Sequence, residues 1–226
     1  MAPPKLYPDI LCEIFQHLAR ARTCKKSENI NVITMKDCLF VNRTWARTAA
    51  PFVWNDPFTY SLNRSKHVIS VYISQLSDDE HKQLGDRGVN IPRNNKNISS
   101  SLLFNYPAYI KNLAYDELII TVRKWAEERL VNIGNNSFAI EYIVKSILRL
   151  FLKNTVYLRT IEINRQTKIW EEDWSMNLWC QEFLELARRT KILALRGCPE
   201  SSAVLVPLTI SCTNLVSHHI SINLTF

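Results

Sequence analysis

The first 58 residues carry more apolar side chains than so short a unit can bury, and this excess limits what the chain can fold into. Residues 6–18 (LYPDILCEIFQHL) predict a helix, because their apolar residues recur at the spacing of one helical face. Pro8 suits the first turn of such a helix, and Asp9 suits its positive end. The apolar face consists of Ile10, Leu11, Ile14, Phe15 and Leu18.

Two further short helices are predicted between residues 33 and 58 (ITMKDCLFVNRTWARTAAPFVWNDPF). Thr34 suits the cap of the first, and Asn42 opens the second, which is expected to stop at Pro51. A unit of this size buries too little of its surface to hide all of its apolar side chains. Part of its apolar surface is therefore expected to be an interface.

The middle of the chain, residues 59–137, is predicted to be a helical connector. It holds an amphipathic helix over 67–76, a polar loop over 77–101, and a helix or strand-helix over 113–130. Residues 138–152 (FAIEYIVKSILRLFL) predict the clearest later helix, with Glu141, Lys145 and Arg149 opposite its apolar side.

The C-terminal part alternates between strand-like and helical patterns. Strands are predicted at 158–164, 192–198 and 220–223, and a helix at 183–189. Strand–helix units repeating at roughly 20–30 residues are typical of leucine-rich repeats, and the pattern Thr190-x-x-Leu193-x-Leu195-x-x-Cys198 fits one. An ordinary α/β core is the alternative.

Sequence motifs for cofactor, metal or catalytic chemistry are not found. The four glycines do not form a phosphate-binding loop, and the six cysteines form no C-x-x-C pair. The histidines lack ligand spacing, and no nucleophile lies in a triad-like context. We expect a non-enzymatic protein without a cofactor or a metal.

The charge and the apolar segments indicate the expected partners and cellular compartment. Twenty-eight Lys and Arg against 21 Asp and Glu give a net charge of +7, but the basic residues are scattered, which argues against nucleic-acid binding. A signal peptide and an apolar stretch long enough to cross a membrane are not seen. The cytosol or the nucleus is the expected compartment.

Residues 6–58 resemble an F-box, the helical motif that docks a substrate receptor onto the Skp-type adaptor of an SCF ubiquitin ligase. The first helix matches the family pattern Leu-Pro-x-Glu-Ile-Leu-x-x-Ile-Phe-x-x-Leu, and the later Val-x-Arg-x-Trp signature stands as Val41, Arg43 and Trp45. The whole resembles fungal F-box proteins with C-terminal leucine-rich repeats. Tyr7 replaces the first proline of the usual pair, and the loop over 19–32 is longer than common.

The resemblance implies an adaptor, a cullin scaffold reached through it, and an unidentified protein substrate presented by the C-terminal region. The expected fold is α+β and mostly α: a three-helix F-box (1–58), the connector (59–137), and an incomplete leucine-rich-repeat-like α/β array (138–226), shortened relative to its family. The alternative function is a basic nucleic-acid-associated or scaffold protein. The sequence does not decide which of the expected adaptor-binding residues face inward; these are Leu6, Pro8, Ile10, Leu11, Ile14, Phe15, Leu18, Leu39, Val41, Trp45 and Trp54.

Overall fold

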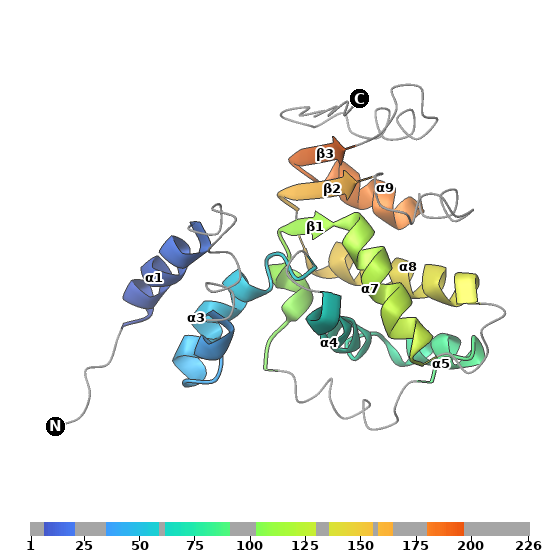
Figure 1. The fold of residues 1–226 in the computed structure, drawn as a ribbon, viewed down its shortest axis with the longest axis horizontal. Helices are drawn as coiled ribbons and strands as arrows, with labels where there is room; N and C mark the ends of the chain where they lie inside the picture. Colours follow the sequence, from blue (N-terminus) through green and yellow to red (C-terminus); the bar gives the residue numbers. More distant parts are fainter. Residues whose placement is uncertain are drawn as a thin grey trace.

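The chain is mostly helical and contains a small three-stranded parallel sheet (Figure 1). The computed structural model describes residues 7–20, 35–58, 62–90, 103–129, 136–155, 158–164 and 180–196. An N-terminal helical unit lies beside a larger body that holds the sheet. Among the described residues, no helix is both long enough and apolar enough to cross a membrane.

The N-terminal helical unit consists of α1 (Pro8–Arg20), a helical turn at 35–38 and α3 (Arg43–Val53). The predicted helices at both ends of this unit are confirmed. Asn42 caps α3, because its side-chain Oδ1 accepts the backbone N–H of Trp45 at 3.0 Å. α1 packs against α3 around a small core made of Leu11, Phe15, Met35, Cys38 and Ala49.

The prediction that α3 stops at Pro51 is wrong. The helix continues to Val53, and the N–H of Trp54 still donates to the carbonyl of Ala50 at 3.0 Å. A proline removes its own helical hydrogen bond and strains the turn before it. Packing of Phe52 and Val53 on the small core offsets this cost and holds the last turn in place.

Residues 54–58 connect the helical unit to the body. The Trp54 ring lies 4.3 Å from that of Tyr106 and 5.7 Å from that of Tyr72, measured between centroids. The carbonyl of Asn55 accepts the backbone N–H groups of Lys111 and Asn112, each at 2.9 Å. These contacts attach the connection to the first strand and to the short 3₁₀ helix η3 (Tyr106–Tyr109).

The polar segment after α4 (Leu62–Ile73) begins with a helix, α5 (Asp78–Asp86), where a loop was predicted. Ser77 and Glu80 form a capping box: the N–H of Glu80 donates to Ser77 Oγ at 3.3 Å, and the N–H of Ser77 donates to the Glu80 carboxylate at 3.0 Å. Leu84 anchors the helix in the core, and Gly88, at a φ of 78°, lies just after its end. Residues 91–101 of the predicted loop lie outside the described residues.

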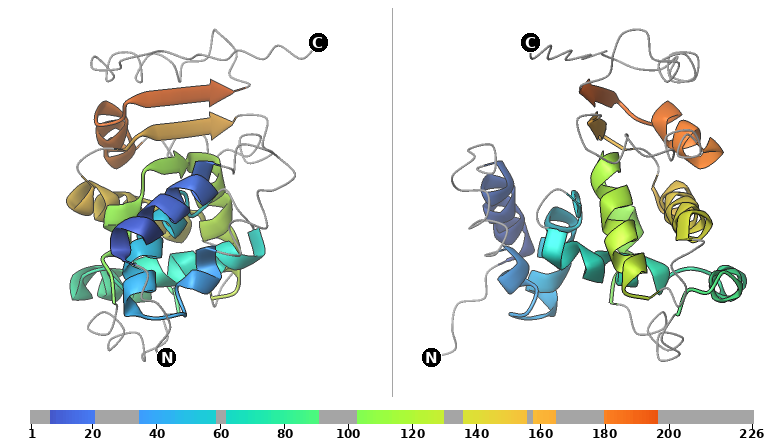
Figure 2. Two further views of the ribbon diagram at one scale, coloured as in Figure 1. Left: turned by 90° about the vertical axis from the view of Figure 1, so that its left-hand side faces the viewer. Right: turned by 45° about the vertical axis from the view of Figure 1, so that its right-hand side comes forward.

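The sheet consists of β1 (Asn112–Ala114), β2 (Thr160–Asn164) and β3 (Ile192–Arg196), which lie side by side in chain order. Both pairs are parallel, and Leu113, Ile161 and Leu193 lie in register. The helices α7 (Tyr115–Glu127), α8 (Asn136–Asn154) and α9 (Gln181–Arg188) connect the strands, and α8 and α9 lie on the same side of them (Figure 2). The inward residues Leu113, Ile161, Ile163 and Leu193 are buried, as is expected of a parallel sheet whose crossover helices cover it.

Two of the three predicted strands, at 158–164 and 192–198, are confirmed as β2 and β3. The third predicted strand, at 220–223, lies outside the described residues. The third strand of the observed sheet is β1, inside the predicted connector, and one hydrophobic core runs from Phe58 to Leu193. The domain boundary predicted at residue 138 therefore crosses this core. The sequence does not predict β1, because a strand of three residues is too short to show an alternating pattern.

Candidate protein-docking surface

The apolar face of α1 is divided between the small core and solvent. Successive helical residues are turned by about 100°, so residues at i, i+3 and i+7 lie along one flank. Tyr7, Ile10 and Ile14 have this spacing and are 72%, 46% and 41% exposed. Leu11 and Phe15 lie on the adjacent flank and are buried. α3 covers the flank of Leu11 and Phe15. The flank of Tyr7, Ile10 and Ile14 is left as an apolar stripe that faces solvent.

Phe15 is the centre of the buried flank. Its ring lies 6.1 Å from that of Trp45, edge to face, and 6.0 Å from that of Phe52. Leu18 and Leu39 are half-buried against the same core. These side chains hold α1 against α3, and they thereby fix the position of the exposed stripe on α1.

A second exposed apolar segment precedes α3. Phe40 is 86% exposed and Val41 is 57% exposed. They lie in a turn in which the N–H of Phe40 donates to the Asp37 carbonyl at 3.0 Å, and Asn42 then caps α3. Leu39 packs inward, and the turn leaves the two following side chains outside.

The predicted docking residues therefore differ in their exposure. Pro8, Ile10, Ile14 and Val41 are exposed, whereas Leu11 and Phe15 are buried and Leu18, Leu39 and Trp45 are half-buried against the small core. Trp54 packs on the body, and Leu6 lies outside the described residues. The residues that the structure brings together at the surface of α1 are Ile10 and Ile14, joined by Tyr7, which the sequence analysis did not include.

Phe40 and Tyr7 are the exposed apolar residues of the N-terminal helical unit that were not among the predicted docking residues. Phe40 stands in a run of three apolar residues, Leu39 to Val41, just before the capping residue Asn42. Such a run cannot bury every member in a short turn, and this was the available signal. Tyr7 was noted as a departure from the family pattern, without a role.

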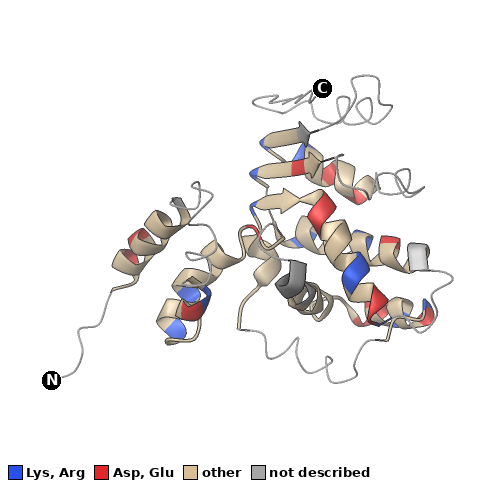
Figure 3. Cartoon of the chain, viewed as in Figure 1, with Lys and Arg blue, Asp and Glu red and all other residues tan. Residues whose placement is uncertain are grey.

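Charge differs between the two long helices of the unit (Figure 3). The charged side chains described on α1 are acidic, Asp9 and Glu13, and those on α3 are basic, Arg43 and Arg47; all four are exposed. The apolar stripe on α1 thus has acidic neighbours, an arrangement that favours a partner surface with an apolar centre and a basic rim.

The thiol of Cys38 is a packing group in the small core. Burial raises its pKa, and the neighbouring Asp37 carboxylate raises it further, so the thiol is neutral near pH 7. Among the described residues, no three His, Cys, Asp or Glu side chains gather as metal ligands would. The chemistry that these residues support is apolar contact.

Comparisons of the chain with protein-family models, with curated proteins and with solved structures gave no match. The functional interpretation therefore depends on the motifs and on the surface described above.

Proposed function

We propose that the chain is the substrate-receptor subunit of an SCF-type ubiquitin ligase. In this proposal the N-terminal helical unit binds a Skp-type adaptor and, through it, a cullin scaffold. The body presents a protein target, ubiquitin transfer is done by other subunits, and the complex works in the cytosol or the nucleus. The observation that carries the proposal is the exposed apolar stripe of Tyr7, Ile10 and Ile14 on a helix whose sequence resembles the first helix of an F-box.

The exposure of this stripe supports docking over a purely internal role. A helix that served only the small core would need apolar residues only on the flank of Leu11 and Phe15, which packs against α3. The apolar residues on the other flank are then left without a role in the core. Five of the large apolar side chains exposed in the described residues lie between residues 7 and 41: Tyr7, Ile10, Ile14, Phe40 and Val41. Gathered exposed apolar residues are a mark of protein–protein interfaces.

The body is consistent with the proposed target-presenting array. β2, α9 and β3 form a strand–helix–strand unit in which Ile161 and Leu193, 32 residues apart, lie in register. The three strands stack in chain order, as units of a solenoid do. The connection from β1 to β2 contains two helices, α7 and α8, and an ordinary α/β core has such connections as well. We therefore propose a leucine-rich-repeat-like arrangement for the β2–α9–β3 unit alone.

The test is adaptor binding by surface variants of α1, measured by isothermal titration calorimetry with a purified Skp-type adaptor. Ile14→Glu places a charge in the stripe, and we expect binding to weaken at least tenfold, since apolar anchors at interfaces are each worth about 2–4 kcal/mol. The matched control is Gln16→Glu, on the opposite and exposed side of α1. Circular dichroism of both variants checks the fold.

Two outcomes would overturn the proposal. One is that wild-type protein does not bind the adaptor. The other is that folded Ile14→Glu and Phe40→Ala both bind as tightly as wild type. Salt separates this proposal from the nucleic-acid-associated alternative: apolar docking changes little with salt, whereas phosphate binding weakens steeply.

A further inference from the structure

The N-terminal helical unit carries a second exposed surface, which complements the apolar stripe of α1. Phe40 and Val41 are exposed directly before the cap of α3, and Arg43 and Arg47 are exposed on α3 itself. The two arginines are four residues apart, so they lie on one flank of the helix. We call these four residues the basic–apolar face. It combines two exposed apolar side chains with two cations.

The apolar stripe of α1 has the opposite charge beside it. Asp9 and Glu13 are exposed and are also four residues apart. Ile10 lies three residues before Glu13, so the acidic pair follows the stripe on the side away from the small core. Four residues span about 6 Å along a helix in both pairs. The two acids and the two arginines therefore have matching spacing.

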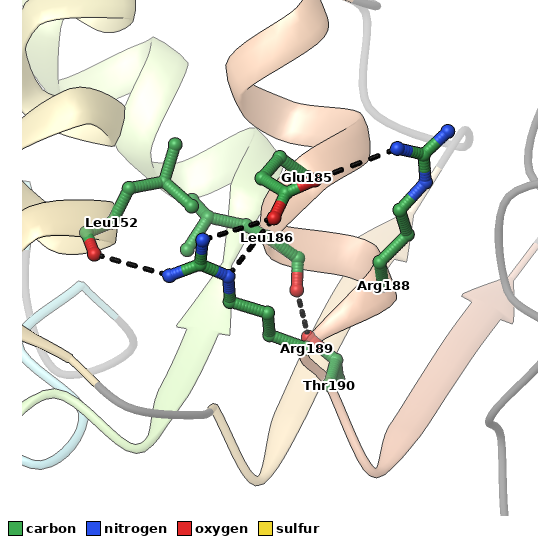
Figure 4. Close-up of polar contacts among 6 residues, drawn as sticks. All are labelled: Leu152, Glu185, Leu186, Arg188, Arg189 and Thr190. Atoms are coloured by element: carbon green, nitrogen blue, oxygen red, sulfur yellow. Dashed lines mark hydrogen bonds and ion pairs between the residues drawn. The ribbon is translucent and has the colours of Figure 1, made fainter.

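The acidic pair of α1 and the two arginines of α3 have no ion-pair partner within the described part of the chain. The exposed arginines of α9 differ in this respect (Figure 4). Arg188 lies 3.5 Å from the Glu185 carboxylate, and Arg189 donates to the same carboxylate at 2.9 Å and to the Leu152 carbonyl at 3.3 Å. The cations of α9 are thus used inside the fold, whereas those of α3 are available to a partner.

Arg43 opposes the stability of its own helix. It is the first residue of α3, where the positive helix end favours an acid, and the first turn of α3 has none. Local choices that oppose stability are expected at functional sites. A carboxylate brought by a partner is attracted both by the Arg43 guanidinium and by the helix end.

We propose that the basic–apolar face binds the apolar stripe of α1 on a second copy of this chain. The acidic pair of one copy faces the two arginines of the other, and the stripe covers Phe40 and Val41. Because each copy carries both surfaces, the contact is reciprocal and closes as a dimer. The dimer itself is independent of the proposed function. Its consequence, that the dimer and the adaptor compete for α1, rests on that function.

A second copy is the occupant that accounts for both surfaces at once. An exposed Phe beside two arginines would also suit a nucleic-acid base and its phosphate. Such a ligand would leave the stripe exposed, and Asp9 and Glu13 would repel it. A foreign protein with a basic rim would cover the stripe and leave the basic–apolar face exposed. The sequence also carries four basic residues at 20–26, so the test includes single-stranded RNA as a competitor.

The test is sedimentation-velocity ultracentrifugation of the full chain without adaptor, over about a hundredfold range of concentration. We expect a monomer–dimer equilibrium that weakens with salt, because salt screens the ion pairs. One variant combines Asp9→Lys with Glu13→Lys, and the other combines Arg43→Glu with Arg47→Glu. Each should associate at least tenfold more weakly, since each reversal acts twice in a reciprocal dimer.

Mixing the two charge-reversed variants gives the sharpest result. Their surfaces complement each other, so an equal mixture should dimerise although neither variant does so alone. Both variants keep a positive net charge, because the chain carries +7 and two reversals remove at most four. General attraction between opposite charges therefore does not explain the recovery. Phe40→Ala should also weaken association, whereas Lys82→Glu, an exposed charge reversal on α5, is the matched control and should associate as wild type. Circular dichroism checks each fold.

Four results would overturn the proposal: a wild-type monomer at every concentration, wild-type association by the folded charge-reversed variants, no recovery in their mixture, or displacement of the second copy by single-stranded RNA at the same salt. The adaptor titration is separate. Adaptor binding by a chain that is monomeric alone sinks the dimer only, and a dimer that never binds the adaptor sinks the ligase proposal only.

Discussion

Replacing Phe15 by alanine should strongly destabilise the N-terminal helical unit and leave the stability of the body unchanged. Phe15 is 1% exposed and contacts the rings of Trp45 and Phe52. A buried Phe→Ala change costs about 3–5 kcal/mol, because the cavity adds to the lost transfer energy. Among the described residues, the small core has five buried members and shares none of them with the large core, so the cost falls on α1 and α3.

Hydrogen–deuterium exchange read by mass spectrometry measures this effect region by region. A loss of about 3 kcal/mol corresponds to roughly 100-fold faster exchange in peptides from α1 and α3, where local opening limits exchange. Peptides from α8 should keep their wild-type rate. The matched control is Phe40→Ala, the same chemical change at a side chain that is 86% exposed, for which we expect a change within about 0.5 kcal/mol.

Unchanged exchange in α1 would refute the role of Phe15 as the centre of the small core. Equal acceleration in α1 and α8 would refute the independence of the two cores. The expected result also means that Phe15→Ala cannot test adaptor docking, since lost binding would follow from lost structure. Ile14 and Phe40 are the appropriate positions for that test.

Two further predictions concern α5 and α9. Glu80→Ala removes half of the capping box and should destabilise α5 by about 1 kcal/mol, seen as faster exchange over residues 78–86, whereas Lys82→Ala should have a smaller effect; equal effects would contradict the capping role. Burial raises the pKa of Cys180 to about 11, so at pH 8 iodoacetamide should modify the half-buried Cys12 well before Cys180, and denaturant should remove the difference. Equal rates in the folded chain would contradict this burial.

Elements with a long, regular apolar pattern could be predicted from the sequence. α8 and the helical part of the 113–130 segment were found because their apolar residues keep one period over several turns. α5 was missed because its composition is polar, and a single buried residue, Leu84, attaches it to the core. Ser77 and Glu80 were the readable signal for its start.

The sequence could place the candidate docking surface on α1, but it could not predict which flank of the helix is exposed and which is buried. Ile10, Leu11, Ile14 and Phe15 belong to one apolar face in any helical projection. The flank that becomes buried depends on where α3 crosses α1, and this is a property of the tertiary structure. The same holds for Trp54, whose neighbours Tyr72 and Tyr106 are distant in sequence.

The ring contacts at Trp54 have a consequence for the shape of any assembly built on this chain. The aromatic contacts continue from Trp54 through Tyr72 to Phe151 of α8, with centroids 5.7 and 5.1 Å apart. These two ring pairs meet edge to face, and the Asn55 carbonyl accepts two backbone hydrogen bonds, so both side-chain packing and backbone pairing join residues 54–58 to the body. Under the proposed function, these contacts would limit how far a partner bound on α1 can move relative to a target bound by the body.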